Sequence, residues 1–266
     1  MNALEVQIEG IGLWAPGWPD WDSACLGLRR GEPPRADAPA RPAPALLPAA
    51  ERRRAPDPVL IACEVAAQAC AAADREPSAL ASVFTSSHGD TAITDYMCST
   101  LAQAPRELSP IRFHNSVHNA PAGYWTIAAR CHAASTSISG YTASFAGGLL
   151  EAAVQALAGD EPVLLVAYDT VSPQPLAEVV PSAPAFGIAL VLAPARAGDG
   201  LPGLLLLPDA QAKPTPLVLP DAFAAIAAGN PMAASALPFA TALVSDAAAT
   251  LVLPLGTRGG LGVVLR

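Results

Sequence analysis

Residues 109–170, SPIRFHNSVHNAPAGYWTIAARCHAASTSISGYTASFAGGLLEAAVQALAGDEPVLLVAYDT, decide the fold of this 266-residue chain. Within this stretch, Ser137 to Tyr141 predicts a strand, Phe145 to Ala158 predicts a helix, and Thr142 lies in the turn between them. Val163 to Tyr168 is wholly apolar, which indicates a strand buried on both faces. This order of strand, turn, helix and buried strand predicts an α/β fold with helices packed on a sheet.

The same stretch resembles the centre of the β-ketoacyl synthases of fatty-acid and polyketide assembly. In that family a pattern S-P-x-x-F, followed by N-x-x-A-G, leads through a buried strand into A-C-x-S, whose cysteine takes the growing acyl chain. Asn119, Ala122, Gly123 and Ser144 stand where the family pattern places them, and Thr142 stands at the position of the cysteine. The resemblance covers residues 6–192 and implies a thiolase-like fold.

The exchange of cysteine for Thr142 bears directly on activity. The family's cysteine lies in a strand-to-helix turn, where backbone N–H groups and the helix dipole stabilise a thiolate. A threonine hydroxyl is a far weaker acid and needs an adjacent base before it can attack. The family's two histidines lie in a C-terminal half that the resemblance does not reach. We therefore expect no catalytic residue, a vestigial nucleophile position at Thr142, and a structural role for Ser144.

The chain outside this stretch follows the family order at its N-terminal side. Val6 to Leu13 alternates apolar and polar residues and predicts a strand, and Asp22 to Arg30 predicts a short helix capped by Asp20 or Asp22. Residues 32–50 are rich in Pro and Ala and predict an extended loop. A second helix is expected to begin at Pro58 with Asp57 as its cap, and to bury a stripe at helical spacing. That stripe comprises Val59, Cys63, Ala66 and Cys70.

Further strands and one more helix are expected from the same patterns. Asp90 is expected to cap a helix whose apolar face comprises Ile93, Met97 and Leu101. Strands are predicted at 80–85, 186–192, 204–207, 250–255 and 261–265. These patterns predict an α/β fold with helices on both faces of a mixed sheet, and the resemblance implies that the fold is thiolase-like, a single N-terminal-type half with a five-stranded sheet. We expect this domain to span residues 1–194 and a short β-rich C-terminal extension, residues 195–266, to pack on it.

The composition excludes several classes of protein. The net charge of −8 and the pI of about 4.9 argue against nucleic-acid binding, which needs a clustered positive face. No apolar run approaches the roughly 18 residues of a membrane-spanning helix. The N-terminus lacks the basic start and apolar core of a signal peptide, so we expect a cytoplasmic chain. Five unclustered cysteines show no metal spacing and are expected to be reduced and mostly buried.

Three polar clusters invite alternative interpretations. His114 and His118 are four residues apart, as metal ligands on a helix often are, but no third ligand accompanies them, and a contact role is favoured. Residues 86–90, SSHGD, resemble a hydrolase set, yet neighbours on one turn rarely have triad geometry, so turn and cap roles are favoured. Arg52-Arg53-Arg54 is interpreted as a solvated loop edge rather than a docking site for an acidic acyl carrier protein. We expect neither a metal nor a cofactor.

The resemblance implies a function as well as a fold. Ketosynthase-like proteins without the cysteine include chain length factors, which pair with an intact synthase, and the small ketosynthase-like proteins of aryl polyene pigment clusters. By analogy with thiolase-type dimers, Ala134 to Tyr141 is expected to be the central interface strand. The residues expected at the interface or along the acyl tunnel are Phe113, His114, Ser116, His118, Asn119, Ser135, Ser137, Ile138, Ser139, Tyr141 and Phe145.

The expected function is thus a non-catalytic subunit, chain-length-factor-like, that pairs with a full-length β-ketoacyl synthase in polyketide or fatty-acid-type polyene biosynthesis. Two alternatives stay open at this point. One is a residual acyl-transfer or thioesterase enzyme that uses Thr142 or Ser144. The other is a homodimeric module that binds acyl groups or acyl carrier protein without catalysis.

Overall fold

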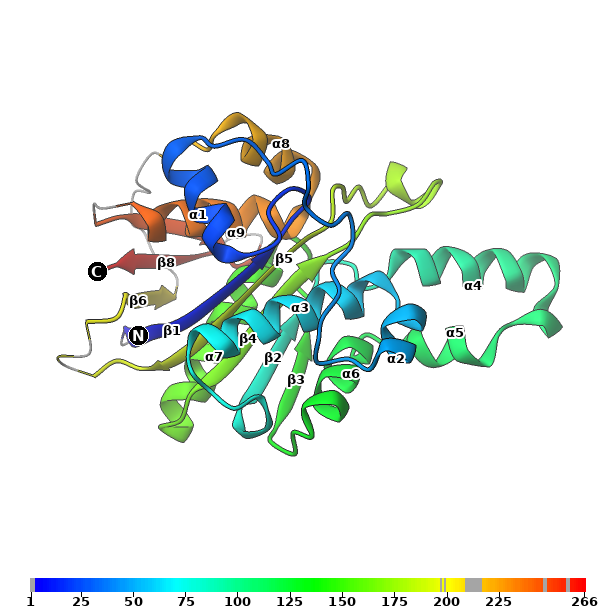
Figure 1. The fold of residues 1–266 in the computed structure, drawn as a ribbon, viewed down its shortest axis with the longest axis horizontal. Helices are drawn as coiled ribbons and strands as arrows, with labels where there is room; N and C mark the ends of the chain where they lie inside the picture. The colour runs from blue at the N-terminus through cyan, green and yellow to red at the C-terminus, as the bar shows by residue number, and fades with distance from the viewer. Residues whose placement is uncertain (1–2, 197, 199, 209–216, 246–247, 257–258) are drawn as a thin grey trace.

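We describe the fold from a computed structural model, which describes residues 3–196, 198, 200–208, 217–245, 248–256 and 259–266. One mixed sheet runs through the molecule, and its strands follow in the order β3-β2-β4-β5-β1-β6-β8-β7 (Figure 1). The strands are β1 (Leu4–Trp14), β2 (Ala81–Thr85), β3 (Ser135–Ile138), β4 (Val163–Asp169), β5 (Phe186–Pro194), β6 (Gly203–Pro208), β7 (Thr250–Pro254) and β8 (Gly260–Leu265).

Strand direction divides this sheet into two parts. β3, β2 and β4 are parallel to one another, and all other neighbouring strands pair antiparallel. β4 is buried along its whole length, and β5 is buried from Phe186 to Ala193. These two strands are therefore the centre of the sheet, because only strands with both faces covered can be apolar throughout.

Helices cover both faces of the sheet. They are α1 (Trp21–Arg30), α2 (Ala49–Arg54), α3 (Asp57–Ala72), α4 (Thr91–Gln103), α5 (Pro110–Asn115), α6 (Ala120–Ala129), α7 (Ser144–Gly159), α8 (Asp221–Gly229) and α9 (Pro231–Val244). α3 and α6 share one hydrophobic core with one face of the central strands, whereas α7 and α9 share another core with the opposite face. No helix of the described residues is long and apolar enough to cross a bilayer.

The predicted fold class is confirmed, with a difference in the number of strands. The five strands β3-β2-β4-β5-β1 form the expected mixed sheet, and β6, β8 and β7 extend it to eight strands. β6 pairs with β1, so the chain beyond residue 194 continues the same sheet. The strand pieces predicted after residue 194 are present and antiparallel, but α8 and α9 were not predicted.

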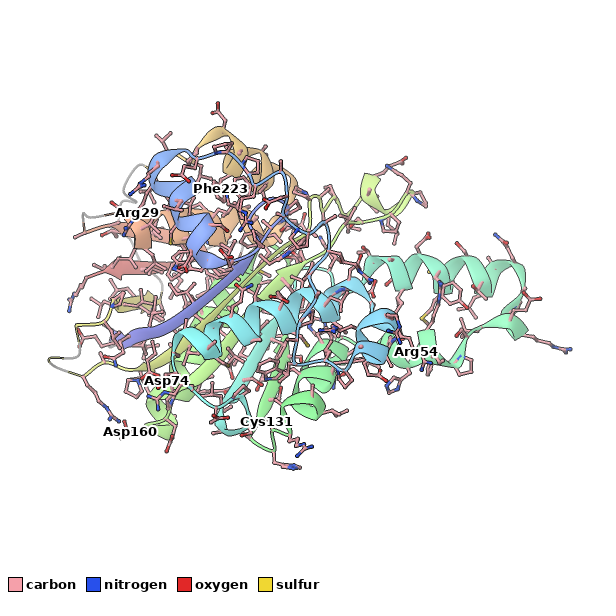
Figure 2. All side chains as sticks on the ribbon, viewed as in Figure 1. Arg29, Arg54, Asp74, Cys131, Asp160 and Phe223 are labelled. Atoms are coloured by element: carbon pink, nitrogen blue, oxygen red, sulfur yellow. The ribbon has the colours of Figure 1, made fainter. Side chains whose placement is uncertain are left out.

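The C-terminal helices complete the core beside α7. Phe239 of α9 packs edge-on against Phe145 of α7, with ring centroids 5.4 Å apart. Phe223 of α8 stacks on Trp18, with centroids 4.1 Å apart, and Figure 2 shows this residue between α8 and α1. These contacts join segments that lie far apart in the sequence, which explains why local patterns alone did not reveal the two helices.

Several predicted boundaries need correction. The strand predicted at Ser137 to Tyr141 is β3, Ser135–Ile138, and the chain turns before Tyr141. Asp57 does not cap α3: Pro56 holds the N-cap position, and the Asp57 carboxylate pairs with Arg41 at 2.7 Å. Asp20 caps α1 and Gly31 ends it, as predicted. The segment Arg52–Arg54 lies in the short helix α2 rather than in a loop.

Helices α4 and α5 form an arm that projects from the body of the molecule (Figure 1). Asp90 caps α4 as predicted, since its side chain accepts a hydrogen bond from the Ile93 N–H at 2.9 Å. The predicted apolar face of α4 is only partly buried: Ile93 is buried, but Leu101 is 50% exposed. The arm therefore carries apolar side chains away from the core.

Candidate functional site

Thr142 lies at the sharp bend that joins the sheet to a helix. β3 ends at Ile138, a single 3₁₀ turn spans Tyr141–Ala143, and α7 begins at Ser144. Tyr141 has a φ of +53°, in the left-handed region that non-glycine residues seldom adopt. The Thr142 side chain is exposed to solvent. Residue 142 thus lies in a bend between strand and helix, as the sequence predicted, and presents a hydroxyl there.

Hydrogen bonds from Ser144 and its neighbours brace this turn against β2. The Gly140 N–H donates to Ser144 Oγ at 2.9 Å, and Ser144 Oγ donates to the Ser86 carbonyl at 3.3 Å. Thr85 Oγ1 donates to the Ser144 carbonyl at 3.0 Å, and Ser139 Oγ donates to the Ser87 carbonyl at 3.1 Å. The turn that carries Thr142 is therefore held by the segment that follows β2.

A buried carboxyl group holds that segment from the other side. Asp169 Oδ1, at the end of β4, accepts a hydrogen bond from Ser86 Oγ at 2.7 Å and another from the Ser87 N–H at 2.8 Å. Burial raises the pKa of Asp169, against the lowering effect of these hydrogen bonds and of His88. Sequence reasoning did not single out Asp169, although an acid at the end of a wholly apolar strand is an available signal.

The SSHGD segment does not assemble a catalytic triad among the described residues. Asp90 is the cap of α4, and the two serines bind Asp169 rather than His88. The His88 ring packs against the Tyr141 ring, with centroids 5.2 Å apart, and its Nε2 is buried without a hydrogen-bond partner in the described part of the chain. Turn and cap roles account for Ser86, Ser87 and Asp90.

The two histidines considered for metal binding do not lie on one helix. α5 ends at Asn115 and α6 begins at Ala120, so His114 and His118 do not share one helix, contrary to the expectation from their spacing. His118 Nε2 lies 3.0 Å from the Ile138 carbonyl oxygen; since that oxygen only accepts, Nε2 carries the hydrogen. Among the described residues, no cluster of three metal-ligating side chains occurs.

β3 is an edge strand, and its backbone shows which groups face outward. The Ser82 N–H donates to the Ala134 carbonyl, and the parallel register pairs Ser82 with Ser135 and Phe84 with Ser137. In such a ladder Ala134 and alternate residues direct their backbone groups to β2, so Ser135 and Ser137 direct theirs to the open edge. No strand of the described chain lies beyond β3.

Of the other residues predicted for the interface or the acyl tunnel, all but one reach the surface. Phe113, His114, Ser116, His118, Asn119, Ser139 and Tyr141 are exposed or partly exposed. Phe145 is only 1% exposed and packs in the core against Phe239, so it does not lie on the surface with the others. His114 and Asn119 also line an apolar groove of about 610 Å³ between residues 46–51 and the α5–α6 segment.

Half of the exposed large apolar residues fall in one part of the sequence. Twelve large apolar residues of the described chain are exposed, and half of them lie between residues 101 and 141. Exposed apolar surface is typical of interaction sites when it is contiguous. The six are Leu101, Ile111, Phe113, Val117, Ile127 and Tyr141.

Comparison with known families agrees with the fold described above. Residues 18–205 match the sequence model of the β-ketoacyl synthase N-terminal domain. Because this match spans well over half of the chain, the protein belongs to the β-ketoacyl synthase N-terminal domain family. A search of curated protein sequences gave no match.

Solved structures share the fold at low sequence identity. A chain of the ketosynthase ApeO in complex with its chain length factor ApeC, from Xenorhabdus doucetiae, has a TM-score of 0.73 and 22% identity, over 98% of this chain and 99% of that chain. A chain of the type II polyketide complex AntDE:AntF, an acyl-carrier protein with its ketosynthase, has a TM-score of 0.71 and 10% identity, over 99% of both chains. A β-ketoacyl synthase from Burkholderia phymatum STM815 has a TM-score of 0.58 and 15% identity, over 72% of this chain and 59% of that chain.

Proposed function

We propose that this protein is a non-catalytic, chain-length-factor-like subunit that pairs with an active β-ketoacyl synthase in polyketide or fatty-acid-type biosynthesis, of the aryl polyene kind. The observation that carries the proposal is Thr142, which lies in the bend between the open edge strand β3 and α7, at the position where the resemblance in sequence implies the nucleophile. A hydroxyl there needs a base to attack a thioester. The sequence pattern and the local geometry thus favour a ketosynthase-like fold that lacks the reactive thiol.

The open edge of β3 supports the pairing. Edge strands expose N–H and C=O groups that other chains can bind, and proteins normally cover or blunt them. The outward groups of Ser135 and Ser137 are suited to an antiparallel strand from a partner. The exposed apolar side chains of the α4–α5 arm and of α6 would be buried by the same partner, which is the expected source of most of the binding free energy.

The compared structures support the kind of partner. The ApeO–ApeC complex is described as a ketosynthase with its chain length factor. A second structure, described as the ishigamide ketosynthase and chain length factor, has a TM-score of 0.55 and 14% identity, over 72% of this chain and 59% of that chain. We therefore propose a full-length synthase as the partner of this chain and an acyl carrier protein as a further component of the complex.

A proline placed on the open edge tests the pairing. Ser137→Pro removes an outward N–H while the β2–β3 ladder stays intact, because proline is tolerated on an edge strand where its nitrogen faces away from the neighbour. Ser137→Ala keeps the N–H and serves as the matched control. Each variant would be co-expressed with a β-ketoacyl synthase from the same gene cluster, and the complex measured by size-exclusion chromatography with light scattering.

We expect the wild type and Ser137→Ala to form a stable 1:1 complex, and Ser137→Pro to lose it while remaining folded by circular dichroism. Two separate species with the wild-type chain would overturn the proposal. A wild-type homodimer that persists in the presence of the synthase, and that dissociates in Ser137→Pro, would also overturn it. In that case the β3 edge would pair with a second copy of this chain and not with the synthase.

Thr142→Ala tests the absence of catalysis within the complex. Because the hydroxyl has no assigned chemical step, we expect the reconstituted pathway to give the same products at an unchanged rate. Acyl transfer to the wild-type chain from a carrier-protein thioester, lost in Thr142→Ala, would show instead that Thr142 is a nucleophile.

A further inference from the structure

A cavity of about 550 Å³ lies between the arm and the start of α3, and it is distinct from the Thr142 turn. Its walls come from six places in the chain: Arg41, Arg54 of α2, residues 56–58 before and in α3, residues 90–93 at the start of α4, the Ser109–Asn115 stretch, and Thr170–Val171 after β4. Asp90 follows β2 and Thr170 follows β4, so the cavity lies at the carboxyl ends of two parallel strands. Ligands of open α/β sheets commonly bind at such ends, in pockets of this size.

Arginine side chains give the cavity its charge. Arg41, Arg54 and Arg112 line it. The Arg41 guanidinium is bound to the Asp57 carboxylate at 2.7 Å and to the Ala55 carbonyl at 3.0 Å, so its charge is compensated. Among the described residues, no carboxylate is paired with Arg54 or Arg112. Two guanidinium groups are therefore available to an anion.

Arg112 is fixed in place without losing its hydrogen-bond donors. Its guanidinium carbon lies 4.1 Å from the centre of the Tyr96 ring. Stacking on an aromatic face leaves the in-plane N–H groups of arginine directed outward, where they can bind an oxyanion in bidentate geometry. Figure 2 shows Arg54 on α2, beside the base of the arm, so the second guanidinium approaches from a different element.

Both acidic residues on the wall already have partners. Asp57 is paired with Arg41, and Asp90 accepts the Ile93 N–H as the cap of α4. A carboxyl group whose oxygen already accepts a hydrogen bond opposes an anion less than a free, exposed carboxylate does. The remaining wall combines polar residues, among them Ser109 and Asn115, with an apolar part that includes Ile93, Ile111 and Val171.

We propose that this cavity binds an organic oxyanion, whose phosphate or carboxylate head group is held by Arg54 and Arg112 while a short apolar body lies against Ile93, Ile111 and Val171. The two arginines supply charge and direction for the head group. The apolar wall distinguishes an alkyl-bearing anion from a free inorganic one. The proposed site uses no residue of the β3 edge, so it does not depend on the proposed pairing with a synthase.

The test is calorimetric titration of the full chain with hexyl phosphate, hexanoate and inorganic phosphate. We expect at least one hexyl compound to bind more tightly than inorganic phosphate. Arg54→Ala and Arg112→Gln should each weaken that binding about tenfold, the usual effect of one charge-assisted hydrogen bond. Arg53→Ala is the matched control: Arg53 is exposed on the same helix and does not line the cavity, so affinity should be unchanged.

Arg54→Ala is the decisive variant, because Arg54 is exposed and its loss leaves the core untouched; circular dichroism would verify the fold of both arginine variants. Absence of saturable binding at millimolar concentration would overturn the proposal. Equal affinity in all variants would do the same, since binding would then lie elsewhere. Inorganic phosphate that binds as tightly as both hexyl compounds would refute the role of the apolar wall. A preference for hexyl phosphate or for hexanoate would identify the head group.

Discussion

Ser86 Oγ donates to Asp169 Oδ1 over 2.7 Å, and this bond joins the ends of the neighbouring parallel strands β2 and β4. The second carboxyl oxygen, Asp169 Oδ2, is buried without a hydrogen-bond partner among the described residues. A buried carboxylate with hydrogen bonds to only one of its oxygens lowers the stability of the folded state, because the other oxygen has lost its water. The segment that it holds also contacts the Thr142 turn, so Asp169 lies beneath the support of this turn.

Asp169→Asn should change how stability depends on pH. Because burial raises the native pKa of Asp169, the folded state binds this proton more tightly than the unfolded state does. The stabilising contribution of that proton is complete below the unfolded pKa of about 3.9 and is lost as pH rises through the raised native pKa. Each unit of difference between the two values corresponds to about 1.4 kcal/mol.

Asparagine keeps the acceptor for Ser86 and the Ser87 N–H and does not titrate. As the pH rises from about 4 to neutrality, we therefore expect the free energy of unfolding to fall less in the variant than in the wild type. Urea unfolding at a series of pH values measures the difference. Parallel curves for the two proteins would contradict the assignment of a raised pKa to this carboxyl.

Ser144→Ala should destabilise the protein by about 1–3 kcal/mol, because the Gly140 N–H and the Ser86 carbonyl both lose a buried partner. Ser99→Ala, on the exposed side of α4, is a matched control and should stay within about 0.5 kcal/mol of the wild type. Chemical denaturation gives both values. A Ser144 variant as stable as the control would mean that the turn is held by other contacts.

Alanine substitutions at the two adjacent glycines of α7 should change the stability of the protein in opposite directions. A Cβ at Gly148 would lie 2.8 Å from Thr85 Cγ2 and 3.0 Å from Leu165 Cδ1, so Gly148→Ala should cost about 1–3 kcal/mol. At Gly147 the nearest such atom is Ile138 Cδ1 at 3.9 Å, and Gly147→Ala should stabilise by about 0.5–1 kcal/mol through helix propensity. Thermal unfolding of the two variants checks the signs, and a shared sign would refute this packing of α7 on β2 and β4.

Thiol labelling should separate the buried cysteines from the exposed one. Burial raises the pKa of both Cys63 and Cys70 to about 12, which leaves very little thiolate at pH 8. Cys98 is exposed on α4. Iodoacetamide at pH 8, followed by peptide mass spectrometry, should modify Cys98 first and Cys63 and Cys70 only after unfolding. Early labelling of Cys63 would show that α3 is not packed on the sheet as described.

The elements predicted most closely are those whose signals are local. The apolar run of β4, the Asp20 and Asp90 caps and the bend at Thr142 each follow from a few adjacent residues. Asp57 was misjudged as a cap because its pairing with Arg41, from the preceding loop, has no local signature. Phe145 was assigned to the interface or the acyl tunnel without knowledge of its core partner Phe239, because Phe239 is contributed by a helix that local patterns did not reveal.

The amino-acid sequence by itself determined the family and the α/β class, because periodicity and a contiguous motif need no knowledge of distant contacts. Only the tertiary structure decided that Asp169 holds the segment beneath the Thr142 turn, that β3 is an open edge and that Arg54 and Arg112 face one cavity. These features join residues far apart in the chain, 83 positions for Ser86 and Asp169. Such pairings depend on how the strands are ordered in space, and strand order is set by packing across the whole sheet.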